Sequence, residues 1–129
     1  MARRPTDGPT DGELAILGVL WDRGPSTARD VHEALCRRRP TAATTTLKLM
    51  QIMVDKGLLA RDESRRPQVY CAAATKERTQ RKLIGNLMAR AFDGSAAQLV
   101  LRALSAHETS AEELDAIRRL LDRMEGAKS

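Results

Sequence analysis

The chain has 129 residues, of which 42% are hydrophobic and 30% charged, enough apolar side chain to bury a core, so an intrinsically disordered protein is excluded. Aromatic residues make up only 2%, which leaves aliphatic and methionine side chains to fill the core and favours helices over a β-sandwich or barrel. No apolar run approaches the about 20 residues of a membrane span, and no apolar signal segment begins the chain. Two cysteines are too few for a disulfide scaffold, so we expect a cytoplasmic protein with reduced thiols.

The charge is unevenly distributed along the chain. The net charge is +5, but residues 1–90 hold 17 basic and 10 acidic residues, whereas residues 91–129 hold 5 basic and 7 acidic ones. The net charge of +7 over residues 1–90 indicates that this part binds a polyanion, and the net charge of −2 over residues 91–129 indicates that this part has a different function.

The first elements are an arm and a helix. Residues 1–9 contain two prolines and a glycine and are expected to form a flexible arm. Thr10 and Glu13 have the spacing of a capping box, which predicts that a helix begins after Thr10. Apolar residues follow at helical spacing, and Gly24 ends this helix.

Two further helices follow. One is predicted at about 26–37, capped by Ser26 or Thr27 and stopped by Pro40. The next is predicted at about 42–56, with Gly57 just past its end. Its inward stripe has the spacing i, i+3, i+4 and i+7 and consists of Thr46, Leu49, Met50 and Met53.

The pattern then changes to a small β-hairpin. A short apolar run at 58–61 and an alternating run at 68–71 are typical of strands, and the charged segment 62–67 supplies the turn.

Three more helices complete the chain. They begin at Thr75, Ser95 and Ser110, of which the last two open capping boxes. The final helix carries an a/d-type seam suited to packing against a partner helix.

Three short helices followed by a hairpin are the element order of a winged helix-turn-helix, in which the second helix of the pair enters the DNA major groove. The predicted fold is therefore mainly α with a small β-hairpin. It has a DNA-binding domain at 10–74 and a helical domain at 75–125.

The helix at 42–56 has the surface that DNA recognition requires. Threonine and glutamine side chains can bond base edges or phosphates, leucine can touch a thymine methyl, and lysine can reach guanine or phosphate. The hairpin arginines are expected to contact flanking phosphates. The predicted DNA-binding residues are Ala43, Thr44, Thr45, Leu47, Lys48, Gln51, Arg61, Arg65 and Arg66.

Several segments together resemble the penicillinase-repressor (BlaI/MecI) family of bacterial regulators. The resemblance covers about residues 10–125 without large insertions. It is carried by ELAILGVLW (13–21), STARDVHEAL (26–35), TTTLKLMQIMVDKGLL (44–59), LMARAFDGSAAQLVL (87–101) and SAEELDAIRRLL (110–121).

The resemblance implies that the helical domain at 75–125 is a dimerisation domain. It implies a homodimer that binds an inverted-repeat operator in double-stranded DNA and blocks transcription by occupying a promoter. It also implies release by proteolysis in members linked to a membrane sensor metalloprotease, and control of antibiotic resistance in some members. The bond that corresponds to the family's cleavage site lies near Arg102 and Ala103, where the best-known members have Asn and Phe.

Dimerisation also follows from the residues themselves. About 55 residues in three helices bury little core alone, so their apolar faces are better satisfied against a second copy. The predicted dimerisation residues are Leu83, Leu87, Leu99, Leu104, Leu114, Ile117, Leu121 and Met124.

Other functions stay open as alternatives. One is a metal- or ligand-sensing regulator that uses Cys36, Cys71 or a histidine, and another is a protein-interaction module that does not bind DNA. The favoured interpretation has both cysteines as small buried hydrophobic residues. His32 and His107 are expected to be surface or packed residues without metal-ligand spacing. We find no catalytic constellation and expect no enzyme activity, metal or cofactor.

Overall fold

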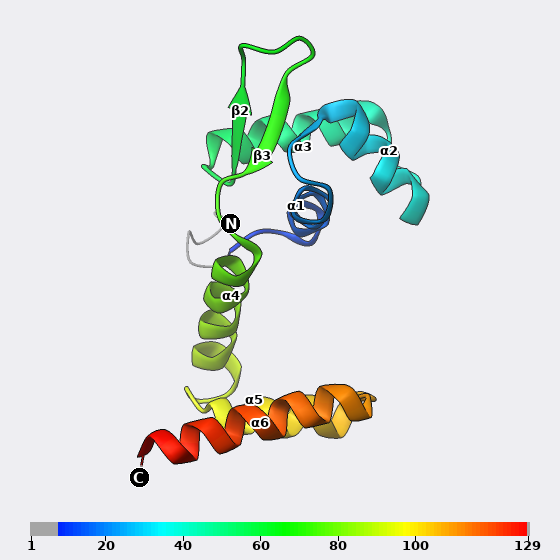
Figure 1. The fold of residues 1–129 in the computed structure, drawn as a ribbon. Helices are drawn as coiled ribbons and strands as arrows, with labels where there is room; N and C mark the ends of the chain where they lie inside the picture. The colour runs from blue at the N-terminus through cyan, green and yellow to red at the C-terminus, as the bar shows by residue number, and fades with distance from the viewer. Residues whose placement is uncertain (1–7, 129) are drawn as a thin grey trace. The chain divides into compact units, whose positions relative to one another are not determined.

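The computed structural model describes residues 8–128, and the predicted arm lies outside the described residues except for Gly8 and Pro9. The chain divides into two compact units between Asn86 and Leu87 (Figure 1). The first unit contains α1 (Asp11–Arg23), β1 (Ser26–Thr27), α2 (Ala28–Arg38), α3 (Ala43–Asp55), β2 (Leu59–Asp62), β3 (Val69–Ala72) and most of α4 (Lys76–Ala91). The second contains the end of α4, α5 (Ala96–Ala106) and α6 (Ala111–Lys128).

Helix α1 begins at the predicted capping box. The Glu13 amide donates to Thr10 Oγ1 at 3.1 Å, and the Thr10 amide donates to Glu13 Oε1 at 2.8 Å. Two of the orphan amides at the start of the helix are thereby satisfied. The helix ends at Gly24, whose φ of 83° is in the region that favours glycine.

The sheet has three strands rather than the two of the predicted hairpin. Strand β3 lies in the centre, and β1 and β2 pair with it in antiparallel fashion. Ser26 pairs with Tyr70, so residues 26–27 belong to the sheet and α2 begins only at Ala28. The predicted cap is confirmed at Thr27, the second of the two candidates, whereas the pairing of residues 26–27 with β3 was not predicted. Thr27 caps α2 by accepting a hydrogen bond from the Asp30 amide at 3.1 Å.

Helix α3 follows α2 after a short turn and ends in a glycine motif. The Gly57 amide donates to Val54 O at 3.1 Å, and the Leu58 amide donates to Met53 O at 2.8 Å. This is a Schellman pair, and Gly57 has the φ of 81° that the motif needs. The prediction of Gly57 as the residue just past the helix is confirmed.

The core of the first unit lies where α1, α2 and α3 meet the sheet. In Figure 1, α1 is seen end-on beside α2 and α3, and the connection between β2 and β3 projects away from the helices as a wing. Met50 and Met53 of α3 are fully buried, as the inward stripe predicts. They pack with Ile16, Leu17, Val19, Leu20, Val31, Leu59 and Tyr70.

The first turns of α4 belong to the winged-helix unit. Trp21 Nε1 donates to Ala74 O at 3.0 Å, and Thr79 is buried. Leu83 lies against Gly8, where an added Cβ would come within 3.2 Å of Leu83 Cδ2. These contacts explain why the unit extends to Asn86, although the sequence suggests a domain boundary after residue 74.

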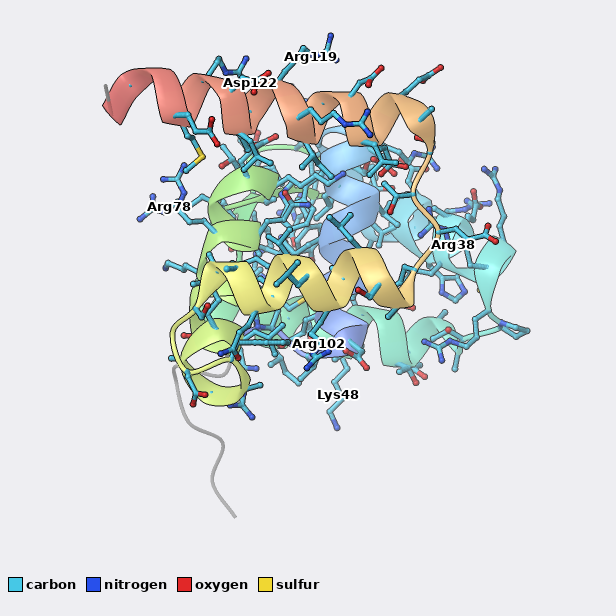
Figure 2. All side chains as sticks on the ribbon, turned by 90° about the horizontal axis from the view of Figure 1, so that it is seen from below. Arg38, Lys48, Arg78, Arg102, Arg119 and Asp122 are labelled. Carbon is cyan, nitrogen blue, oxygen red and sulfur yellow. The ribbon has the colours of Figure 1, made fainter. Side chains whose placement is uncertain are left out.

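The second unit is open. Within residues 87–127 no side chain is buried, and α5 and α6 are separate ribbons in Figure 2. Ser95 accepts a hydrogen bond from the Gln98 amide, and Ser110 from the Glu113 amide, so both helices start where the sequence predicts. Over residues 8–128, no helix has the length and apolar character that crossing a membrane requires.

Candidate nucleic-acid interface

One face of α3 is exposed and carries the predicted DNA-binding residues. Lys48 points away from the chain in Figure 2, and Leu47 is 42% exposed although it is apolar. Thr46, one position before Leu47, is only 1% exposed, so the helix has one buried and one open side. The open side holds Ala43, Thr44, Thr45, Leu47, Lys48 and Gln51, and every one of these residues is exposed.

A part-buried polar contact joins α3 to α2. His32 Nδ1 lies 3.0 Å from Thr46 Oγ1, and Thr46 stands on the inner side of α3. The contact is part-buried and joins the two helices of the helix-turn-helix directly. The rotation of α3, and so the direction of its outer face, is therefore held by a polar contact as well as by methionine packing.

Cys36 extends this network to the turn between the two helices. Its Sγ lies 3.5 Å from His32 Nε2 and donates to Thr41 O at 3.4 Å. Cys36 and Cys71 are both free thiols and both half-buried, so the expectation of buried cysteines was wrong. The sequence analysis also missed that His32 and Cys36 are spaced i, i+4 and so meet on one face of α2.

The three predicted arginines of the wing, the connection between β2 and β3 with its flanking strands, differ in their ion-pair partners. Arg61 pairs with Glu63 at 2.9 Å, and Arg65 lies 3.5 Å from Asp62. The hydrogen bond with Tyr70, and after it that with Glu63, raises the pKa of Arg61 despite some loss of solvation. Within the described part of the chain Arg66 has no carboxylate partner and is exposed, so it is the wing cation most available to an outside anion.

Cations at the end of α2 add to this surface. Arg37, Arg38 and Arg39 are all exposed, and they precede the turn that leads into α3. Arg38 points outward in Figure 2. The sequence analysis did not assign these residues to the interface, although their place before the exposed helix was visible in the sequence. No side chain caps the first turn of α3, whose N-cap residue is Ala42.

An ion pair anchors the other end of α3. Lys56 Nζ lies 2.8 Å from Glu13 Oε2 of α1, and the Glu13 side chain is almost fully buried. Burial by itself would raise the pKa of Glu13. The hydrogen bond from Lys56, the hydrogen bonds with Thr10 and the charge of Lys56 together hold that pKa below its ordinary value of 4.5.

The predicted dimerisation residues differ in exposure. Leu83 is half-buried inside the first unit, so the structure does not bring it together with the others. Leu87, Leu121 and Met124 are 44%, 52% and 51% exposed. Four more residues are half-buried in the second unit, namely Leu99, Leu104, Leu114 and Ile117. Arg102 and Ala103, at the predicted cleavage region, are exposed on α5.

Within residues 8–128, no group of three or more histidine, cysteine, aspartate or glutamate side chains is arranged to hold a metal ion. His107 is exposed at the C-terminal end of α5.

Comparison with known proteins decides the family. The sequence profile of the penicillinase repressor family matches residues 9–123, which is most of the chain. The chain belongs to the penicillinase repressor family. A curated relative, "Transcriptional regulator BlaI" of Mycobacterium tuberculosis, is 33% identical over 116 residues in strains CDC 1551 / Oshkosh and ATCC 25618 / H37Rv. The match covers 89% of this chain and 83% of the relative. This penicillinase repressor family member thus belongs among transcriptional regulators, which are not enzymes.

Two solved structures are similar to this family member at low sequence identity. One is a MarR family transcriptional regulator from Silicibacter pomeroyi, 20% identical, with a TM-score of 0.44 over 92% of this chain and 69% of that one. The other is a structure of reduced AbfR bound to DNA, 15% identical, with a TM-score of 0.43 over 94% of this chain and 75% of that one.

Proposed function

We propose that this penicillinase repressor family member is a homodimeric repressor whose α3 enters the major groove of an inverted-repeat operator. The observation that carries the proposal is the outer face of α3. Six exposed side chains without a carboxylate stand opposite a buried stripe, and α2 holds the helix in place through His32 and Thr46. A helix that reads base edges needs this combination of a fixed inner side and an accessible outer side. The acidic residue of α3, Asp55, stands only in the last turn of the helix.

The surrounding cations support contact with the DNA backbone. Arg37–Arg39 flank the start of α3, and Arg66 is the unpaired arginine of the wing. Phosphate contacts of this kind provide affinity and orientation, whereas the α3 side chains provide sequence discrimination. Arg61 and Arg65 would have to leave Glu63 and Asp62 before they could bind a phosphate, so we expect less from them.

The test is a binding titration of the full chain on a duplex from its own upstream promoter. Lys48→Ala and Gln51→Ala should each weaken binding by about 1–3 kcal/mol on the specific duplex, because each removes one contact to a base or phosphate. Lys76→Ala and Gln80→Ala are matched controls, since they remove the same side-chain types from exposed positions of α4. Binding should also fall steeply as salt rises.

Two results would contradict this proposal. One is equal affinity for the promoter duplex and a scrambled duplex at every salt concentration. The other is an equal loss of affinity in the α3 variants and their α4 controls. The first of these would favour the alternative of a protein-interaction module.

The open second unit supports the homodimer. Its helices carry apolar side chains that a single chain leaves accessible, among them Leu101 at 65% exposed, Leu121 and Met124. Monomeric proteins rarely expose an apolar area of this kind, whereas helix seams of dimers cover such faces. Two DNA-binding units related by a two-fold axis would then meet the two halves of an inverted repeat.

Release by cleavage completes the proposal. The bond between Arg102 and Ala103 lies inside α5 on exposed residues, where a protease can approach the chain. A cut there would separate α6 and its apolar seam from the DNA-binding unit. The repressor would then lose its second copy and with it the affinity of a two-site contact.

A further inference from the structure

The first unit contains a cavity of about 870 Å³ that the DNA interface does not use. It lies between α1, the segment that follows α3, and the first turns of α4, with all its lining residues before Leu87. Its volume is in the range of small-molecule sites, which is about 300–1,000 Å³.

The lining combines apolar and cationic side chains. Leu17, Leu58 and Leu83 are its large apolar members, and Leu17 is only 2% exposed. Arg78 and Lys82 stand one turn apart on α4 and are both exposed, and Figure 2 shows Arg78 extending outward. No aspartate or glutamate belongs to the lining that the described residues form.

The charges of this cavity are not balanced. Lys56, the third cation of the lining, is already paired with Glu13 at 2.8 Å. Arg78 and Lys82 have no carboxylate partner among residues 8–128. Among the described residues, two positive charges thus stand beside an apolar surface without an acidic side chain to neutralise them.

We propose that this cavity is a binding site for a small organic anion with an apolar body, such as an aromatic carboxylate or sulfonate. The leucines would cover the body, and Arg78 and Lys82 would bind the acidic group through charge-assisted hydrogen bonds. A free inorganic phosphate would leave the leucines in water, and a neutral apolar molecule would leave the two cations without a partner. An anion with an apolar body would contact the leucines and also give the two cations a partner.

The place of the cavity gives binding a regulatory consequence. Lys56, Gly57 and Leu58 directly follow the proposed recognition helix and line the cavity. An anion bound there would contact the C-terminal anchor of α3 and the start of α4 together. A ligand that prefers one arrangement of these segments changes DNA affinity by the same factor by which DNA changes ligand affinity. This consequence rests on the proposed function, whereas binding itself does not.

Binding can be measured without DNA. The probe is anilinonaphthalene sulfonate, and its matched partner is N-phenylnaphthylamine, which has the same aromatic body without the sulfonate. The full chain should bind the sulfonate saturably, at about one molecule per chain and about tenfold more tightly than the neutral compound. Arg78→Gln combined with Lys82→Gln should weaken sulfonate binding about tenfold or more and leave the neutral compound unaffected.

The control carries the same change of charge on the same helix. Lys76→Gln combined with Arg81→Gln also removes one lysine and one arginine from exposed positions of α4, but neither residue lines the cavity. This control should bind the sulfonate within twofold of the natural chain. The proposal is overturned if the natural chain does not prefer the sulfonate, if both double variants lose binding equally, or if neither does. A failure to bind DNA would leave this result unchanged, so the two proposals fail separately.

Discussion

Single residues decide how the outer face of α3 is held. Thr46 and His32 form a polar contact between the two helices, and Glu13 with Lys56 secures the far end of α3 against α1. Both contacts involve buried groups, so their loss costs more than the loss of an exposed pair. The residues between them on the outer face of α3 are exposed and so accessible for binding.

The Glu13–Lys56 pair predicts a pH-dependent contribution to stability. The pKa of Glu13 is lower in the folded chain than its ordinary 4.5, so the folded state favours the ionised carboxylate. The contribution is fully present above the unfolded pKa of 4.5 and is lost as the pH falls through the folded value. Glu13→Gln should therefore lower the free energy of unfolding by about 1–3 kcal/mol at about pH 7.

Urea unfolding at about pH 7 and about pH 4 measures this difference. The gap between the natural chain and Glu13→Gln should begin to shrink at the lower pH, because that pH lies below the unfolded pKa of 4.5 and the ionised carboxylate no longer favours folding in full. Glu33→Gln is the control, since it removes a carboxylate from the exposed pair with Arg29. A gap that stays constant between the two pH values would show that Glu13 stabilises the fold by packing alone.

The helices of the chain differ in how much of their surface is buried. Helix α3 has a buried inner stripe, whereas α5 has no buried residue and exposes Val100 and Leu101. Few buried contacts make local opening easier, and α5 shares this property with α6, so a protease could find an unfolded stretch in α5.

The predicted cut in α5 can be checked by mass. Whole-chain mass spectrometry of cells exposed to a penicillin as the inducer should show a fragment that ends near Arg102 and one that begins near Ala103. Ala103→Pro is uninformative because it would break α5, so the comparison variant is Arg102→Asn, which changes one exposed side chain. Induction that leaves the chain intact would remove proteolytic release from the mechanism.

At the scale of the whole molecule, the proposed homodimer would cover exposed apolar side chains of the second unit, Leu121 and Met124 among them. Arg119 and Asp122 lie on the edge of α6 that is turned away from α5 in Figure 2, which leaves the apolar seam on another side of the helix. Leu121 of that seam is 52% exposed in the single chain. Its replacement should therefore harm assembly without harming the fold of the first unit.

Leu121→Glu should convert a dimer into single chains. A carboxylate at a buried seam without a partner costs about 3 kcal/mol or more, which raises the dissociation constant about 100-fold or more. Sedimentation at a concentration where the natural chain is dimeric shows this change directly. Ala116→Glu adds the same carboxylate to α6 away from the seam and should stay dimeric. A natural chain that sediments as a single subunit would refute the homodimer.

The sequence by itself determined the local features of this protein. Caps at Thr10, Thr27, Ser95 and Ser110, the glycine end at Gly57 and the two-sided pattern of α3 follow from neighbours within about four positions, and the structure confirms each. The family resemblance was visible for the same reason, since its motifs are continuous segments. The outer residues of α3 could thus be named before any coordinates, although their role in DNA binding stays a prediction.

The tertiary structure alone decided everything that depends on pairing between distant segments. The strand at 26–27 exists because β3 arrives beside it, the wing leaves Arg66 unpaired because its own acids take Arg61 and Arg65, and Leu83 joins a cavity wall rather than the second unit. Local periodicity states which side of a helix is apolar, but it does not state what lies against that side. Packing between segments far apart in the chain settles that question. It placed Arg78 and Lys82, which have no carboxylate partner among residues 8–128, beside a leucine of α1 and one that follows α3.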